Sequence, residues 1–215
     1  MIKFFRRVTL VLIFCFVGLL FNLKNDSVKL DYSSVLFKGL KKTLVLFSGQ
    51  HIILADLSTA RLYLFKWYSA GYCLSFACTF SASKARCCNI MDSLGTPLGW
   101  HFVCEKIGYN IPLGGEFIGR KFTGVIVPKA RSLKERGRIL TRVLRLKGCE
   151  WGKNLGVDSQ GRCCDTYRRC VYIHGTSLED LIPQPLSCGC LLLKTDHLLY
   201  LFDQVSVGAL CCIRK

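Results

Sequence analysis

The order of apolar and polar positions predicts a chain built mainly of short strands. Short apolar runs that alternate with polar residues, or that are rich in aromatic and β-branched side chains, are typical of β-strands. The polar residues Ser58–Ala60 separate two such runs and predict a tight turn, hence a hairpin over Ile52–Lys66. The runs lie at Leu44–Phe47, His51–Asp56, Arg61–Trp67, Thr123–Val127, Ile139–Leu146, Cys170–Ile173 and Ala209–Ile213.

One segment has a helical period instead. In Asp196–Val205 the apolar residues recur at a spacing of three to four, which predicts a short amphipathic helix. Thr195 precedes it and is expected to be its N-cap. The charged, proline-free segment Arg131–Arg138 fits either one helical turn or a solvated loop. The pattern as a whole indicates a mostly β chain with a single clear helix.

The N-terminus has the pattern of an export or anchor segment. Three basic residues precede the uninterrupted apolar run Val8–Phe21, which is shorter than the roughly twenty residues of a free-standing membrane-spanning helix. No small-residue cleavage pattern follows Phe21, so residues 1–26 are expected to be an uncleaved signal-anchor in the inner membrane. A cleaved signal peptide is the alternative. Residues 27–215 then form one domain outside the cytoplasm.

The charge balance suggests an anionic partner. The chain carries 30 Lys+Arg against 14 Asp+Glu, a formal net charge of +16. It lacks zinc-finger spacing, a glycine-rich phosphate loop and an aromatic RNA-binding signature, so nucleic acid is not an expected partner. The segment Lys129–Lys147 contains eight basic residues and only one acidic residue, Glu135. This excess of positive charge predicts salt-sensitive binding to anionic wall or membrane material. A solvated basic face is the alternative.

The chemistry-bearing residues lie near the C-terminus. Twelve residues separate His174 from the segment Ser187–Cys190, which reads Ser-Cys-Gly-Cys. A cysteine and a histidine brought together by a fold form a thiolate–imidazolium pair, which is a sulfur nucleophile. The other histidines, His51, His101 and His197, lie in strand or helix patterns and are expected to be structural or surface groups. The pattern therefore favours Cys190 and His174 as a catalytic pair.

These segments, in this order, resemble the catalytic domain of the L,D-transpeptidases, the cysteine enzymes that cross-link peptidoglycan. The resemblance covers Gln50–Ile213 and implies a β-sandwich of mixed sheets with one short helix after the nucleophile. The matching segments are the first hairpin HIILADLSTARLYLFK, the turn LGTPLGWHF at Leu94–Phe102, the segment Leu140–Gly156, the histidine-bearing strand Arg169–Thr176, and SCGC in place of the usual Ser-His-Gly-Cys.

The resemblance also implies a reaction and its central residues. Cys190 is the expected nucleophile, and His174 is the expected base that takes its proton. The Gly175 carbonyl is expected to bind the other imidazole nitrogen and fix its tautomer. The expected substrate is a peptidoglycan stem tetrapeptide, whose acyl group passes through a thioester to an amine on another stem. No cofactor and no metal are expected.

Further roles follow from the same resemblance. Backbone amides of Gly189 and Cys190, with Cys188, are expected to form the oxyanion hole. Ser187, Thr176 and Tyr172 are expected to contact the substrate. For Ser187 and Thr176, a side chain that only caps a turn is the alternative.

Two positions depart from the family pattern. Cys188 stands where histidine is usual, and Leu192 replaces a polar residue that is most often arginine. The loss of that guanidinium removes a group that holds a substrate carboxylate or braces the loop. A degenerate, non-catalytic wall-binding homologue is therefore an alternative. Cys188 is also expected to form a reversible, strained disulfide with Cys190, unless it is a tolerated substitute that points into the core.

Cysteine usage supports a third alternative. The chain has 14 cysteines, including the adjacent pairs Cys87–Cys88, Cys163–Cys164 and Cys211–Cys212, and none shows the spacing of a tetrahedral zinc site. In an exported protein such cysteines form disulfides, including bonds to partner proteins of the envelope. A disulfide-linked structural protein of the envelope is thus the alternative from another class. The alternative for the same cysteines is that they are free thiols that act as small buried side chains.

Overall fold

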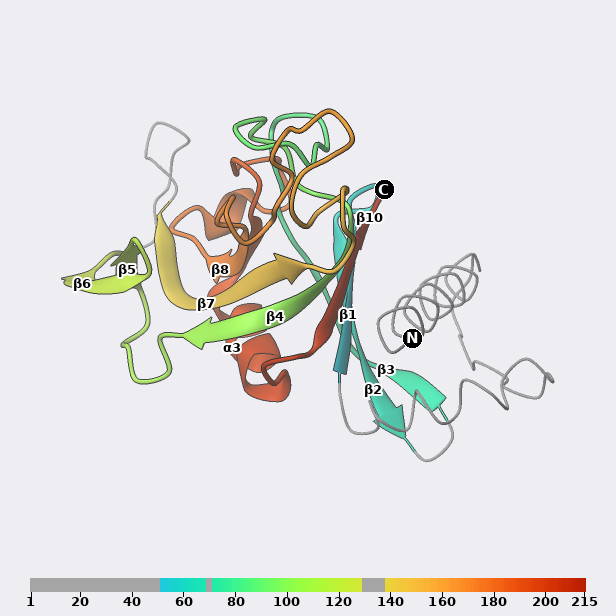
Figure 1. The fold of residues 1–215 in the computed structure, drawn as a ribbon. Coiled ribbons are helices and arrows are strands. Elements are labelled where there is room, and N and C mark those ends of the chain that lie inside the picture. The colour runs from blue at the N-terminus through green and yellow to red at the C-terminus, as the bar shows by residue number, and fades with distance from the viewer. Residues whose placement is uncertain (1–50, 69–70, 129–137) are drawn as a thin grey trace.

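A computed structural model describes residues 51–68, 71–128 and 138–215 of the chain, and Figure 1 shows its fold. These residues form ten strands, one α-helix and a short 3-10 helix, η1 (Glu179–Leu181). The elements are β1 (His51–Asp56), β2 (Arg61–Tyr68), β3 (Gly71–Thr79), β4 (Gly99–Ile107), β5 (Gly115–Ile118), β6 (Lys121–Ile126), β7 (Ile139–Gly148), β8 (Tyr172–Gly175), β9 (Leu191–Leu193), α3 (Thr195–Gln204) and β10 (Leu210–Arg214).

All the strands belong to one mixed sheet. Its order is β3-β2-β1-β10-β4-β7-β5-β6, and β8 and β9 branch from β7. The pairs β1–β10 and β8–β9 are parallel, while the other pairs are antiparallel. In Figure 1 the β5–β6 hairpin lies at the opposite end of the molecule from β2 and β3. The predicted mostly β fold with one short helix is confirmed.

The predicted first hairpin is confirmed as β1 and β2. Asp56 pairs with Arg61 at its closed end, and its carboxylate accepts a hydrogen bond of 3.0 Å from the Ser58 amide. Ala60 completes the turn with a φ of 53°, in the left-handed region that tight hairpin turns use. Gly99, in the turn segment Leu94–Phe102, has a positive φ of 108°.

The predicted helix is confirmed as α3, but Thr195 is not its N-cap. Lys194 occupies that position, and no side chain caps the helix there. Thr195 is instead the first helical residue, and its amide donates a hydrogen bond of 2.8 Å to the buried carboxylate of Glu179. A carboxylate at a helix N-terminus is favourable because the free amides there carry partial positive charge. The cap is therefore supplied from η1, which the local sequence of the helix does not reveal.

Other strand predictions hold with shifted ends. The predicted strands at Thr123–Val127, Ile139–Leu146 and Ala209–Ile213 correspond to β6, β7 and β10. The strand predicted at Cys170–Ile173 begins only at Tyr172, because Cys170 has a φ of 55° that interrupts an extended chain. Leu44–Phe47, the apolar run 8–21 and nearly all of Arg131–Arg138 lie outside the described residues.

Side chains of the central strands alternate between two apolar layers. Leu144, Ile173 and Leu191 point into the main core, where they pack with α3. Val143 and Tyr172 point to the opposite face and pack beneath Phe117 of the β5–β6 hairpin. Since successive residues of a strand face opposite sides, the face under the hairpin is the one that carries His174.

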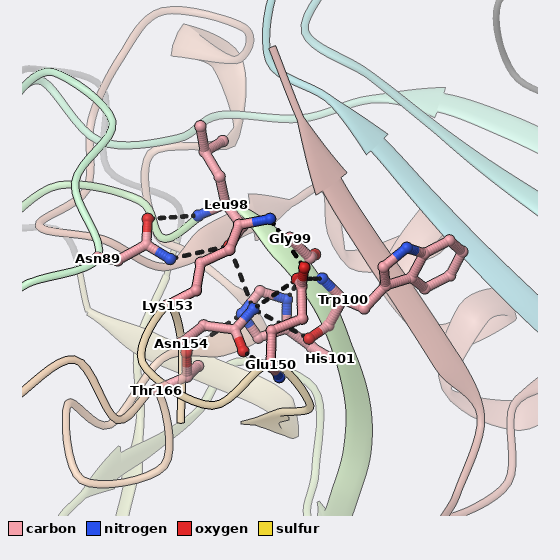
Figure 2. Close-up of polar contacts among 9 residues, drawn as sticks. All are labelled: Asn89, Leu98, Gly99, Trp100, His101, Glu150, Lys153, Asn154 and Thr166. Atoms are coloured by element: carbon pink, nitrogen blue, oxygen red, sulfur yellow. Dashed lines mark hydrogen bonds and ion pairs between the residues drawn. The ribbon is translucent and has the colours of Figure 1, made fainter. Parts of the chain in front are cut away.

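A buried polar network holds the loop after β7 against the start of β4, as Figure 2 shows. The Asn154 side chain is fully buried and donates hydrogen bonds to the carbonyl oxygens of Leu98 and Trp100 at 3.2 and 3.0 Å. A Glu150 carboxylate oxygen accepts from the Trp100 amide at 2.6 Å. The His101 imidazole lies 3.1 Å from the Thr166 hydroxyl. This network anchors the connection that leads back into β8.

No helix among residues 51–68, 71–128 and 138–215 has the length and apolar character needed to cross a membrane.

Candidate active site

The fold brings Cys190 and His174 to the same face of the sheet. Strands β8 and β9 are parallel, with Ile173 beside Leu191 and His174 beside Leu192, so Cys190 immediately before β9 lies beside Tyr172. Alternate residues of a strand share a face, and the thiol therefore faces the same side as His174. Cys190 accordingly packs against the cluster that contains Tyr172 under the β5–β6 hairpin.

The imidazole of His174 is held by its own backbone. Its Nδ1 lies 2.7 Å from the Gly175 carbonyl oxygen, and the side chain is only 4% exposed. A carbonyl oxygen only accepts hydrogen bonds, so Nδ1 carries the proton and Nε2 keeps a lone pair. Gly175 is required here, because a β-carbon would lie 2.7 Å from the Leu140 carbonyl oxygen on the neighbouring strand β7.

The thiol of Cys190 is held by backbone groups. Its sulfur accepts a hydrogen bond from the Tyr172 amide at 3.4 Å and donates one to the Cys170 carbonyl oxygen at 3.6 Å. In the part of the chain that the structure describes, no hydrogen bond joins this sulfur to His174. The two groups share a face, but the thiol proton is directed at a carbonyl oxygen in this conformation.

Burial keeps both members of the pair neutral. It raises the pKa of the Cys190 thiol to about 11, against the opposing effects of the Tyr172 amide and the Arg169 charge. It lowers the pKa of His174 to about 4. At neutral pH the pair is therefore a thiol and a neutral imidazole, not the thiolate–imidazolium pair that the sequence suggests. The free-energy cost of removing the charged forms from water is larger than the stabilisation that the surrounding hydrogen bonds and charges provide.

The loop before the thiol is closed by Ser187. The Ser187 hydroxyl donates to the Cys190 carbonyl oxygen at 2.7 Å and accepts from the Gly189 amide at 3.2 Å. The amide of Gly189, an expected oxyanion donor, is thus engaged within the loop. The amides of Cys188 and Cys190 have no acceptor among the described residues. The Ser187 hydroxyl, expected at the substrate, has a turn-closing role in this conformation.

Gly189 lies in a restricted position. Its φ is +122°, and a β-carbon there would lie 3.2 Å from the Gly95 carbonyl oxygen. The loop that contains Gly95 belongs to the turn segment recognised at Leu94–Phe102 in the sequence. A glycine is needed because the two loops approach each other beside the thiol.

The two other expected substrate residues have different surroundings. The Tyr172 hydroxyl accepts a hydrogen bond of 3.3 Å from Arg120, and burial raises the pKa of the phenol to about 12. The Thr176 hydroxyl is buried and accepts a hydrogen bond of 3.2 Å from the Leu178 amide, as a turn cap does. Thr176 also lines a groove of about 730 Å³ between the base of the β5–β6 hairpin and the start of α3.

Arg169 is a site residue that the sequence does not single out. Its guanidinium donates to the carbonyl oxygens of Cys88 and Gly95 at 2.9 and 2.6 Å and to the Ser93 hydroxyl at 3.3 Å. It therefore fixes the loop that approaches Gly189, and its charge acts to lower the pKa of Cys190. No spacing rule marks such a residue, because its partners, two backbone carbonyls and one serine hydroxyl, are more than 70 positions away.

The two departures from the family pattern are placed differently. Leu192 is buried beside His174, and its amide donates to the Ser81 carbonyl oxygen at 2.8 Å, so this position is part of the packed sheet. Cys188 is exposed, and the alternative that it points into the core is wrong. The Ser187 hydroxyl donates one hydrogen bond and accepts another within this loop, and the Cys188 side chain points outward.

The described cysteines, Cys73 to Cys212, are all free thiols. No group of three or more His, Cys, Asp or Glu side chains in the described ranges is arranged to hold a metal ion.

Half of the basic residues in Lys129–Lys147 lie in the described ranges, and two of them form ion pairs. Arg138 binds Glu116 at 2.9 Å and Arg145 binds Glu105 at 2.8 Å. Part of this charge is therefore used within the protein.

No family model matches the sequence, and no curated protein sequence matches it significantly. Solved structures that it resembles include L,D-transpeptidases and a cell shape determining protein, all at low identity. The cell shape determining protein Pgp2 from Campylobacter jejuni is 15% identical over 77% of this chain and 48% of that chain, with a TM-score of 0.49. An L,D-transpeptidase from Mycobacterium smegmatis is 15% identical over 77% and 59%, with a TM-score of 0.41.

Bd1075 from Bdellovibrio bacteriovorus is 15% identical over 78% of this chain and 48% of that chain, with a TM-score of 0.46. The chain thus spans about half the length of the solved proteins that it matches. At such identity a structural likeness concerns the fold alone, so the activity has to be inferred from residues of this chain.

Proposed function

We propose that this protein is a cysteine acyltransferase of the L,D-transpeptidase type, with Cys190 as nucleophile and His174 as base. One observation carries the proposal. The imidazole is held by Gly175 in the tautomer that leaves Nε2 unprotonated, on the face of the sheet to which the Cys190 thiol also points. A base with a free lone pair and a thiol on one buried face are the minimum requirements for nucleophilic sulfur chemistry.

The neutral resting pair defines how the nucleophile forms. Because the pKa of Cys190 is raised to about 11 and that of His174 is lowered to about 4, no stable thiolate is present at neutral pH. The thiol proton therefore moves to Nε2 as the sulfur attacks the substrate carbonyl carbon, after the thiol has turned from the Cys170 carbonyl. The Tyr172 amide, 3.4 Å from the sulfur, stabilises the developing negative charge.

The subsequent steps use the same residues. The carbonyl oxygen of the substrate becomes an oxyanion, and the free amides of Cys188 and Cys190 are the donors available to it. His174 then returns its proton to the departing amine, and the acyl group remains on Cys190 as a thioester. An acceptor amine attacks this thioester, gives its proton to His174, and releases the thiol.

The substrate class and the location follow from the sequence resemblance. The proposed substrate is a peptidoglycan stem tetrapeptide, and the proposed location is the periplasmic side of the cell envelope. Residues 8–21 are proposed to anchor the chain in the inner membrane, with residues 27–215 as the catalytic domain. The high positive charge of the chain, +16, suits an anionic wall or membrane environment.

Analysis of muropeptides tests this activity. Peptidoglycan incubated with the purified protein is expected to gain new bonds from the third residue of one stem to an amine of another. The Cys190→Ala variant is expected to produce none of them, whereas Cys73→Ala, which changes an exposed thiol on β3, is expected to match the wild type. An unchanged muropeptide profile with the wild type would contradict the proposal.

A second candidate is a non-catalytic protein that binds stem peptides. Two observations favour it: the Cys190 thiol is directed at the Cys170 carbonyl, and the Gly189 amide is occupied by Ser187. A protein of this kind would retain stem peptides without forming a thioester. Binding of a tetrapeptide without any mass increase on Cys190 would select this candidate.

A further inference from the structure

The tip of the β5–β6 hairpin has an unusual residue in a restricted conformation. Ile118 pairs with Lys121, so Gly119 and Arg120 form a two-residue turn. Both have positive φ, 54° for Gly119 and 69° for Arg120. Turns of this type favour Asn or Gly at both positions, because a β-carbon makes the left-handed region less favourable. The arginine at the second position thus goes against a local conformational preference.

The Arg120 guanidinium reaches back over the candidate active site. It donates a hydrogen bond of 3.3 Å to the Tyr172 hydroxyl, and it lies 3.9 Å from the Cys170 sulfur. These are the two residues whose backbone groups hold the Cys190 thiol. Residues 50 positions apart in the sequence are therefore brought together beside the two residues that hold the nucleophile.

The other guanidinium groups nearby already have hydrogen-bond or ion-pair partners within the protein. Arg169 donates to Cys88, Ser93 and Gly95. Arg145 is buried, bound to the Glu105 carboxylate at 2.8 Å and stacked on the Tyr167 ring at 3.4 Å. Arg120 has no carboxylate within ion-pair distance in the described ranges, and its five N–H donors are far from saturated by Tyr172.

We propose that Arg120 binds a carboxylate of the acyl-donor peptide, and so supplies from the β5–β6 hairpin the guanidinium that position 192 lacks. The ligand is a short peptide with a free C-terminal carboxylate next to the bond that Cys190 attacks, and the inference rests in this respect on the proposed function. A guanidinium recognises a carboxylate through two parallel hydrogen bonds. The Tyr172 hydroxyl lies beside Arg120 and is a further donor.

The role of Tyr172 follows from its protonation. Burial raises the pKa of its phenol to about 12, so the hydroxyl keeps its proton at neutral pH. It accepts from Arg120, and its proton, which the Cys170 side chain engages in this conformation, is the one that a bound carboxylate would accept. Leu192, in contrast, is buried beside His174 and offers no polar group. In this proposal the anion-binding group is Arg120 on the β5–β6 hairpin, not a residue at position 192 on β9.

Peptide binding in the Cys190→Ala background tests this role without turnover. The full chain is titrated with a stem tetrapeptide that has either a C-terminal carboxylate or a C-terminal amide, by calorimetry at low salt. We expect Arg120→Gln to weaken binding of the carboxylate peptide about tenfold and to leave binding of the amide peptide unchanged. Arg120→Lys is expected to retain part of the preference. Lys121→Gln, which removes the neighbouring charge, is expected to retain all of it.

The ratio between the two peptides is independent of how much protein is folded, so it is not affected by a partial loss of stability. An Arg120→Gln variant that prefers the carboxylate peptide as strongly as the parent would overturn the proposal. Absence of any binding to the parent would also overturn it. If Arg120→Gln abolishes the preference while wild-type Cys190 forms no thioester, the anion site stands and the proposed catalysis fails.

Discussion

His174 Nδ1 lies 2.7 Å from the carbonyl oxygen of Gly175, the next residue in the chain. This contact fixes both the orientation of the ring and its tautomer, and it needs no carboxylate partner. A charged orienting residue would stabilise an imidazolium, whereas a carbonyl oxygen does so only weakly. The contact therefore suits a base that remains neutral until the thiol proton arrives, in agreement with a pKa of about 4 for His174.

The neutral histidines make stability depend on pH. Burial lowers the pKa values of His101 and His174 from 6.5 to about 4 in the folded protein. The unfolded chain therefore binds more protons as the pH falls below 6.5, and stability is complete above this value and declines toward pH 4. Between pH 7 and pH 5 we expect each histidine to reduce the free energy of unfolding by on the order of 2 kcal/mol.

Urea unfolding at the two pH values measures this effect. The His174→Asn variant is expected to lose its share of the pH dependence and to keep the share of His101. If the variant loses as much stability on acidification as the wild type does, His174 does not have a lowered pKa. The activity of the neutral base would then need another explanation.

A methyl group at Gly189 is expected to impair the site without unfolding the protein. The φ of +122° makes alanine unfavourable there, and its β-carbon would lie 3.2 Å from the Gly95 carbonyl oxygen. We expect Gly189→Ala to slow acylation of Cys190 about tenfold, because the displaced loop carries the amides of Cys188 and Cys190. The rate of adduct formation with a thiol-directed acyl probe measures this.

Gly161 provides a matched control for that substitution. It also has a positive φ, +75°, but a β-carbon there meets nothing within 4 Å. Gly161→Ala is expected to cost about 1 kcal/mol of stability and to leave the acylation rate unchanged. Equal acylation by the Gly189→Ala variant and the control would show that the approach of the two loops has no role at the thiol.

The hairpin β1–β2, the helix α3 and the placement of Cys190 and His174 on neighbouring strands are predictable from the sequence. The first two depend on local periodicity, and the third on the order of motifs along the chain. Strand β9, with three residues, is too short to show a period. Strand β4 begins at Gly99, within a segment whose proline and glycines indicate only a turn.

The protonation states of the site were not predictable, because they depend on tertiary packing. A cysteine and a histidine in sequence suggest an ion pair, but packing against the cluster of Phe117, Val143 and Tyr172 partly buries the thiol and disfavours its charged form. The engagement of the Gly189 amide by Ser187 and the reach of Arg120 to Tyr172 likewise depend on side-chain directions that no spacing specifies.

Oxidation is expected to switch the nucleophile off through Cys188. The Cys188 thiol is exposed, and one residue separates it from Cys190. Oxidised glutathione is expected to join the two sulfurs in a strained disulfide, with loss of both thiol protons and release of two molecules of reduced glutathione. Labelling of Cys190 by an acyl probe should then fall in the wild type and persist in Cys188→Ser.

The control for this lock is Cys170→Ser, which removes the other exposed thiol beside the site. It is expected to be inactivated at the same glutathione potential as the wild type. Loss of labelling in Cys188→Ser at the wild-type potential, or peptide mapping without a Cys188–Cys190 bond, would exclude the lock.

Intact-mass analysis of acylation tests the central claim most directly. A stem tetrapeptide and a carbapenem are each incubated with the wild type and with the Cys190→Ala, His174→Ala and Cys73→Ala variants. The account predicts one covalent adduct on Cys190 in the wild type and in Cys73→Ala, and none in the other two variants, because nucleophile and base act as a unit. A wild type without an adduct, or an equal adduct on Cys190→Ala, would contradict it.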